Sequence, residues 1–221
     1  MRPMTQKSLQ LFLLPVAPLK EGVLFPGLET KMIFTREASK NALRASRRAN
    51  NMIFITAQKN LQADNPKPKD LYEVGTLARV GEISEEGDNM TVEITSLSRV
   101  KAVEWHSARK LLIAHAEVLD DIVDETDEKL EMMREHLLNG FLSLIKVGMV
   151  EIGEDFIAYM RSLPPGQVCD HVANMLSAKN ETKQKILEAL SLRERMKLTL
   201  SQLETEIQVA RVETEVIKKN A

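Results

Sequence analysis

Hydrophobic and polar residues alternate along much of the first 120 residues, whereas later hydrophobic residues recur at helical spacing. Met90, Val92 and Ile94 alternate with polar neighbours, the period of a strand with one buried face. Turn-forming residues at 85–89 lie between this segment, 90–96, and the preceding segment, 76–83. The two segments are therefore predicted to form a hairpin. Further strands are predicted at 9–19, 52–57, 100–104 and 111–119.

One helix interrupts these predicted strands. Thr35 is a suitable N-cap, and alanines recur at helical spacing from Ala38 to Ala49. Arg44, Arg47 and Arg48 fall near its end, where positive charge complements the helix dipole. Residues 60–69 contain two prolines and predict a surface loop.

The composition changes at Asp120, where an acidic segment at 120–128 leads into helical sequence. Thr126 is a candidate cap for a helix whose apolar stripe includes Leu130, Leu137 and Phe141. Pro164 and Pro165 predict the end of a second helix, because proline cannot continue the backbone ladder. The pattern therefore predicts a β region at 1–120, a helical bundle at 121–190 and a long helix at 191–221.

The long helix carries a heptad stripe. Ser191 and Glu194 have the spacing of a capping box at its start. A helix with such a stripe seeks a partner helix, either in an oligomer or within its own bundle, and the pattern does not decide between them. The candidate oligomer positions are Met196, Leu200, Leu203, Ile207 and Ile217.

Composition narrows the class of protein. The 221 residues are 43% hydrophobic, enough for a substantial core, and the formal net charge is −2, which argues against a dedicated nucleic-acid binder. The single cysteine, Cys169, cannot form an internal disulfide, so a reducing compartment is expected. No apolar run is long enough to span a bilayer. The run at 9–19 is favoured as a strand over a signal peptide, because Pro15 and Pro18 interrupt it.

No constellation of residues predicts catalysis, a cofactor or a metal site. Glycines at 22 and 27, and at 148 and 153, have phosphate-loop spacing, but carboxylates follow closely where lysine and a hydroxyl residue are needed. Cys169 and His171 offer two metal ligands at most, and four are usual in a structural zinc site. The arginines at 44–48 lack aromatic neighbours for base stacking, so a solvated helix face is favoured.

The turn at 24–27 has two interpretations. Phe25 could fill one end of a barrel, or the proline-rich segment could expose apolar side chains that cannot all fit inside and so bind a partner protein. The candidate binding residues are Pro15, Pro18, Leu19, Leu24, Phe25 and Pro26.

The motifs at 13–27, 57–59 and 70–80 resemble the N-terminal domain of the ATP-dependent protease Lon, and the helical second half is also similar. The resemblance implies an α+β fold, a PUA-like β-barrel followed by a helical bundle ending in a long helix. It implies a non-catalytic region that selects unfolded or degron-bearing proteins and supports a hexamer, in the cytoplasm or, as the less favoured setting, the mitochondrial matrix. The parent's ATPase and its Ser-Lys protease dyad would lie outside this sequence.

The alternatives to this function are a binding module without a protease, an RNA-binding domain and an independent enzyme. A free-standing Lon-domain binding module, with no protease attached, shares the same N-terminal motifs, although the final helix favours the protease. RNA binding is suggested by a PUA-like fold alone, and the near-neutral charge opposes it. An independent enzyme finds no support in the residues.

Overall fold

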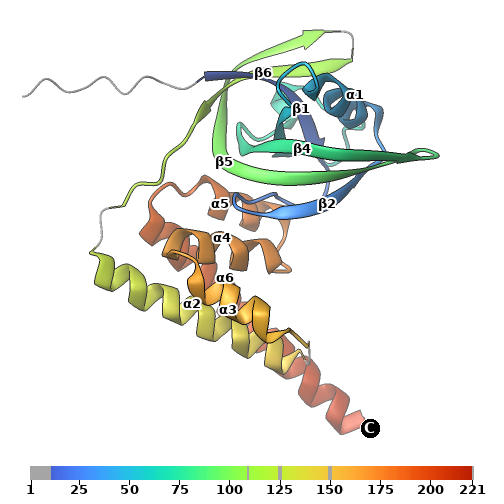
Figure 1. The fold of residues 1–221 in the computed structure, drawn as a ribbon. Helices are drawn as coiled ribbons and strands as arrows, with labels where there is room; N and C mark the ends of the chain where they lie inside the picture. Colours follow the sequence, from blue (N-terminus) through green and yellow to red (C-terminus); the bar gives the residue numbers. More distant parts are fainter. Residues whose placement is uncertain (1–10, 109, 124–125, 149–150, 221) are drawn as a thin grey trace, which may run out of the picture. The chain divides into compact units, whose positions relative to one another are not determined.

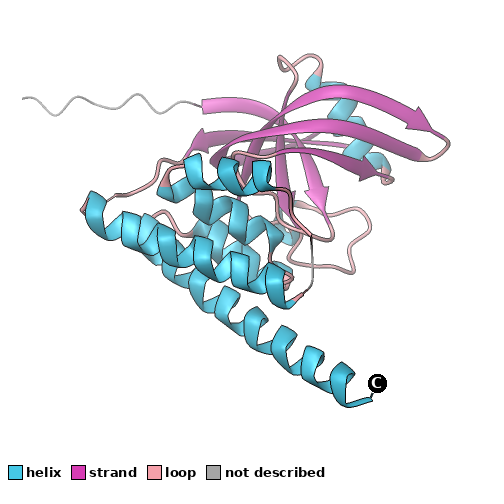
Figure 2. Cartoon of the chain, turned by 60° about the horizontal axis from the view of Figure 1, so that its bottom comes forward, coloured by secondary structure: helices cyan, strands magenta, loops and turns pink. Residues whose placement is uncertain are grey.

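The computed structural model describes residues 11–108, 110–123, 126–148 and 151–220. The chain divides into two compact units, Met1–Asp120 and Asp121–Ala221. The strands lie in the first unit, together with one α-helix and a short 3-10 helix, Pro68–Asp70, and the other helices lie in the second unit (Figures 1 and 2). The first two residues of the predicted strand at 9–19, and residues 124–125 of the acidic segment, lie outside the described residues.

The first unit is built on a mixed six-stranded sheet in the order β2-β5-β4-β3-β1-β6. β5 also pairs with β6, so the hydrogen-bonded pairings run from β5 through β4, β3, β1 and β6 back to β5. β1 and β3 are parallel, and the other pairs are antiparallel. The strands are β1 Leu11–Leu19, β2 Glu29–Phe34, β3 Met52–Ala57, β4 Val74–Glu86, β5 Asn89–Ala108 and β6 Leu111–Val118.

The hairpin predicted around residues 85–89 is confirmed, but the strands are longer than expected. Segments 90–96 and 100–104, predicted as two strands, are parts of the single strand β5. No glycine or proline breaks the connecting residues, and the register against β4 shifts between Leu77 and Ala78, which leaves Leu97 as an extra residue. The irregularity is absorbed as a bulge, so the strand continues instead of turning.

Two clusters of buried side chains fill the sheet unit. One centres on Ile53, Ile55 and Val92, and the other on Leu14, Phe54 and Val100. Gly75 of β4 lies where β3 approaches closely, because an added Cβ would stand 2.4 Å from the Ile55 carbonyl oxygen. β3 and β4 can therefore pack this closely only with glycine at that position.

Helix α1, Glu37–Ser46, packs beside β1 in the sheet unit (Figure 1). Thr35 was predicted as its N-cap, and that prediction is wrong, since the cap position is Arg36 and no side chain caps it. The Arg36 guanidinium instead donates a 2.8 Å hydrogen bond to the Pro18 carbonyl and another to Gln58. These contacts tie the start of the helix to β1.

The second unit is helical. Its elements are α2 Asp127–Val147, α3 Glu154–Ser162, α4 Pro165–Met175, α5 Asn180–Glu188 and α6 Leu192–Asn220. The predicted cap is confirmed, because Thr126 accepts a hydrogen bond from the Lys129 amide, 3.4 Å. The predicted helix end before Pro164 is also confirmed, and Pro165 begins the next helix, where its missing N–H costs no hydrogen bond.

The long helix α6 uses the first half of its heptad stripe inside this unit. Met196 and Leu203 are fully buried and Ile207 nearly so, in one core with residues of α2 and α4, and Leu200 packs against it. Gly140 of α2 permits the approach, since an added Cβ would lie 2.8 Å from a Leu203 methyl carbon. Only half of the predicted capping box is seen: the Glu194 amide donates to Ser191 Oγ, 3.3 Å, while its carboxylate lies 3.2 Å from Lys197.

From position 209 onward the apolar side chains of α6 are exposed. Val209, Val212, Val216 and Ile217 are each more than half exposed. Among the described residues, no helix is long and apolar enough to cross a membrane.

Candidate functional site

A groove of about 490 Å³ opens beside β1 in the sheet unit. Val16 and Pro18 of β1 form its floor, and three further segments form its walls. We call it the β1 groove; its wall residues are Glu37 and Ala38 of α1, Asn65, Pro66 and Lys67 of the loop after β3, and Ser107, Ala108, Lys110, Leu111 and Leu112 of the β5–β6 hairpin.

Hydrogen bonds to the backbone of β1 fix one wall of the β1 groove. The Pro18 carbonyl accepts from Arg36, as described above, and from Ser39 Oγ at 3.3 Å. Both donors lie at the start of α1, so they hold its first turn against β1. Because proline at position 18 has no N–H of its own, its carbonyl is the only backbone group there that can make this connection.

A buried glutamine fixes the loop wall. Gln58, 1% exposed, donates from Nε2 to the carbonyls of Asn60 and Ala63, both at 3.0 Å. At the other end of the loop, Asp70 accepts from the Lys67 amide at 2.9 Å and from Asn60 Nδ2 at 3.3 Å. The hydrogen bond from the Lys67 amide, and to a smaller extent that from Asn60, lowers the pKa of Asp70 below its ordinary value. The loop is therefore held in place by side chains.

The lining of the β1 groove is mostly apolar and includes three charged residues. Glu37, Lys67 and Lys110 are exposed. A hydrogen bond from Lys40, 3.1 Å away, and the Lys40 charge lower the pKa of Glu37. A volume of this size suits a small ligand or a few side chains of a peptide.

The structure places the six residues predicted for partner binding mostly in the interior. Phe25 is fully buried, Pro15, Pro18, Leu19 and Leu24 are buried, and Pro26 is half-buried. Of the two interpretations of this segment, packing inside the sheet unit describes these side chains, apart from the half-buried Pro26. Backbone carbonyls in the turn accept hydrogen bonds from core hydroxyls, Thr76 to Leu24 at 2.6 Å and Ser96 to Phe25 at 2.7 Å. Of the six, Pro18 alone lines the β1 groove.

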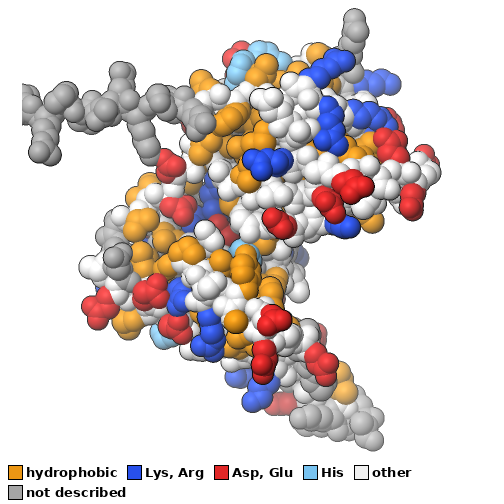
Figure 3. Space-filling model, viewed as in Figure 1, with side chains coloured by type: hydrophobic (Ala, Val, Ile, Leu, Met, Phe, Trp, Pro, Cys, Tyr) orange, Lys and Arg blue, Asp and Glu red, His pale blue; other side chains and the backbone are white. Residues whose placement is uncertain are grey.

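The arginine cluster of α1 is engaged in local contacts. Arg44 lies 3.5 Å from Glu85 and 3.8 Å from Glu37, and Arg47 donates to the Gly81 carbonyl and to Asn51. On the face viewed in Figure 3, basic side chains of the sheet unit lie beside acidic ones. This arrangement fits the solvated helix face favoured from the sequence.

Cys169 and His171 do not share a metal site. Cys169 is fully buried and its Sγ lies 3.2 Å from Thr199 Oγ1. His171 is only 5% exposed, and its Nε2 contacts the Tyr159 hydroxyl while its Nδ1 contacts the Gln167 carbonyl. Asp170, between them, faces Arg195. All three side chains are thus used within the helical unit.

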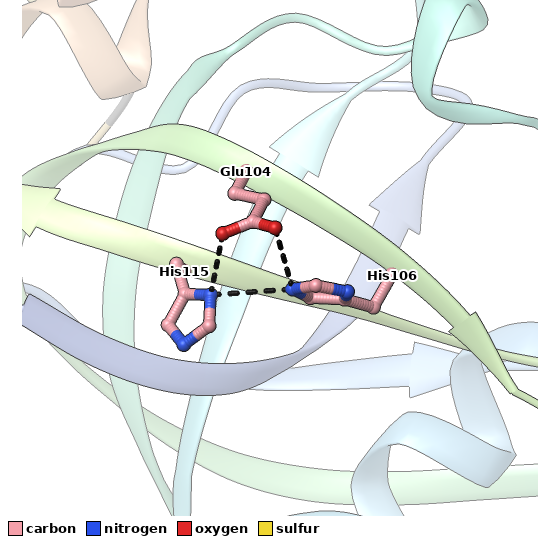
Figure 4. A group of neighbouring side chains, drawn as sticks. All are labelled: Glu104, His106 and His115. Carbon is pink, nitrogen blue, oxygen red and sulfur yellow. Dashed lines mark hydrogen bonds and ion pairs between the residues drawn. The ribbon is translucent and has the colours of Figure 1, made fainter.

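Three other side chains, which the sequence analysis did not select as a group, lie close together. Glu104, His106 and His115 bring one ligand atom each to within 4.8 Å of one another on β5 and β6 (Figure 4). In the sequence, His115 is separated from the other two residues and does not mark them as a group. Glu104 and His106, two residues apart on a strand, gave the available signal, but pairing with His115 depends on the β5–β6 register.

Comparison with known proteins identifies the family to which this chain belongs. Residues 13–205 match the ATP-dependent protease La (LON) substrate-binding domain. The chain therefore belongs to the Lon substrate-binding domain family.

Relatives and solved structures agree with this assignment. Lon protease of Heliobacterium modesticaldum is 27% identical over 92% of this chain, and Lon protease of Wolbachia pipientis is 32% identical over 93%. The matched regions span about a quarter of these relatives, 25% and 26%. The N-terminal domain of Mycobacterium avium complex Lon protease has the same fold, with a TM-score of 0.71 at 14% identity over 87% of this chain and 98% of that one.

Proposed function

We propose that this chain is the non-catalytic substrate-recognition region of a Lon-type ATP-dependent protease, and that the β1 groove binds apolar segments of unfolded proteins. The observation that carries the proposal is the groove itself, with a mostly apolar lining that includes three charged residues. Native proteins bury their apolar segments, so a surface that rewards apolar burial, by about 25 cal/mol per Å², discriminates folding state without reading sequence.

The rigidity of the groove supports this role. Its floor lies near the C-terminal end of β1, and its walls are held by Arg36, Ser39 and Asp70. A preformed groove loses little conformational entropy when it binds, which favours weak but usable affinity for many segments. In an assembly of several copies, weak contacts add through effective concentration. The closed order of strand pairings supports a PUA-like barrel as the scaffold.

Binding to one model protein, native and permanently unfolded by reduction and alkylation, tests the proposal. Ala38→Glu and Ala108→Glu place a carboxylate on opposite walls of the groove, and Ala63→Glu makes the same change in the sheet unit outside the groove. We expect binding to the unfolded form only, at least about tenfold weaker in both groove variants and unchanged in Ala63→Glu. Equal binding by all four proteins would contradict the groove as the site.

Assembly is the second part of the proposal. The exposed apolar side chains at positions 209, 212, 216 and 217 of α6 provide a face for helix–helix contact in a hexamer of the full-length parent. Of the predicted oligomer positions, Ile217 lies on this exposed part, while Met196 and Leu203 are occupied in the core. Sedimentation of the chain and of a Val212→Glu, Val216→Glu variant tests this: we expect concentration-dependent association in the first and monomers in the second.

A binding module with no protease attached is the alternative. It would bind unfolded chains through the same groove, so the binding assay does not separate the two. Whether the gene encodes a phosphate-binding loop after this region separates them directly. The near-neutral net charge opposes nucleic-acid binding. A complex with RNA that dissociates on addition of salt would support it instead. The proposed setting is the cytoplasm.

A further inference from the structure

We propose that Glu104, His106 and His115 form a surface site for a divalent transition-metal ion of the zinc class. The three side chains lie on the exposed side of the β5–β6 hairpin in the sheet unit, and their ligand atoms point toward one another (Figure 4). This site is separate from the β1 groove and does not depend on the function proposed for it.

The backbone explains why these side chains converge. Glu104 lies directly opposite His115 in the β5–β6 pairing, and His106 is two residues beyond Glu104 on the same strand. Between Ala102 and Glu104 the register shifts, which leaves Val103 as an extra residue on β5. Without this bulge, regular pairing would place Val103, not Glu104, opposite His115.

The separation of the two histidine nitrogens matches that of two ligands in a tetrahedral site. His106 Nε2 and His115 Nδ1 are 3.3 Å apart, and Glu104 Oε1 and Oε2 lie 3.5 and 3.4 Å from them, respectively. Two ligands about 2.0–2.1 Å from a zinc ion, at the tetrahedral angle, are about 3.4 Å apart. Cis ligands of an octahedral ion at that range would be about 3.0 Å apart. The two nitrogens therefore stand close to the spacing that four-coordinate geometry requires, and the carboxylate turns one oxygen toward each of them.

The donor set identifies the class of ion. Two imidazole nitrogens and one carboxylate suit zinc, copper, nickel or iron, whereas calcium and magnesium prefer oxygen ligands alone. Three protein ligands leave the fourth tetrahedral position for water, as in zinc sites with two histidines and one glutamate. The side chains are partly exposed, 45% for His106, 38% for His115 and 61% for Glu104, so an ion can reach them from solvent.

Zinc titration of the tag-free, chelator-treated chain by calorimetry tests the site, with Co²⁺ as a spectroscopic probe. We expect one Zn²⁺ per chain and the intense visible absorption of four-coordinate Co²⁺. His106→Ala and His115→Ala should each weaken binding by more than about 10–100-fold, the loss that outer-shell partners alone produce. His136→Ala, an exposed histidine of α2, is the matched control and should bind as the parent does.

Trp105 gives a local readout, since it is the only tryptophan and lies between two of the ligands in sequence. Co²⁺ should quench its fluorescence in the parent and in His136→Ala, but not in the two ligand variants. Circular dichroism checks that the ligand variants fold, and exposed positions of this kind tolerate alanine. Absence of stoichiometric binding, or binding unchanged in both ligand variants, would overturn the proposal.

Discussion

Removal of the Asp121 carboxylate should destabilise the helical unit by leaving a buried arginine short of a partner. Arg195 of α6 is completely buried and donates two hydrogen bonds to Asp121, at 2.7 and 2.6 Å. Asp170, 3.4 Å from Arg195 Nε, is its second carboxylate neighbour. Burial alone would lower the pKa of Arg195, but the hydrogen bond and the charges of both carboxylates raise it above its ordinary value.

The magnitude follows from the geometry. Breaking a buried ion pair from one side costs about 3–5 kcal/mol. Asp121 is 36% exposed, so water screens part of the interaction, and Asp170 remains beside the guanidinium. We therefore expect Asp121→Ala to lower the free energy of unfolding of the helical unit by about 2–3 kcal/mol. Lys197→Ala removes only an exposed pair with Glu194 and should change it by less than about 0.5 kcal/mol.

Urea unfolding followed by two probes measures this effect. Circular dichroism at the helical band reports mainly the helical unit, while fluorescence of Trp105 reports the sheet unit. The Asp121→Ala transition should move to lower urea by circular dichroism, with an unchanged slope. If Asp121→Ala and Lys197→Ala were equally stable, the Arg195 pair would contribute nothing, and the reasoning would be refuted.

Three further predictions concern the core, the close approach of two strands and pH. Leu203→Ala should cost about 2–5 kcal/mol of helical-unit stability and Ile217→Ala almost nothing, because only Leu203 is buried; urea unfolding measures both. Gly75→Ala should destabilise the sheet unit by at least about 1–3 kcal/mol, measured by Trp105 fluorescence in urea, because its Cβ would overlap the β3 backbone. The pKa of Asp70 is lowered in the folded chain, so its contribution to stability should be complete above the unfolded value of about 3.9 and be lost as the pH falls through the lower folded value. Carboxyl NMR titration measures that pKa, and an unshifted value would contradict the Lys67 and Asn60 contacts.

Strands and helices were predictable where periodicity is regular. Met90, Val92 and Ile94 are buried on one face of β5, as their alternation indicates. The N-cap of α2 and the break before Pro164 also followed from local chemistry. The start of α1 did not, because Arg36 is drawn to the Pro18 carbonyl and Gln58, and contacts with residues distant in sequence override the local preference of Thr35.

The candidate sites depend on such distant contacts to a greater extent. The β1 groove combines segments that are brought together only by strand pairing, and Pro18 was the one lining residue selected from the sequence. The bulge at Val103 brings Glu104, His106 and His115 together, and no pattern of residues in the sequence predicts that bulge. For Phe25 the sequence left burial and exposure equally open, because an apolar residue in a proline-glycine turn can belong to the core or to the surface, and the structure buries it fully.

Site-specific photo-crosslinking tests the central claim, that the β1 groove holds unfolded segments, most directly. A benzophenone amino acid replaces Ala108 in the groove wall or Ala63 outside the groove, and each chain is irradiated with the reduced, alkylated model protein or its native form. We expect a cross-link from position 108 to the unfolded form alone, with a yield at least about tenfold higher than from position 63. Equal cross-linking from both positions, or to both forms of the model protein, would contradict it.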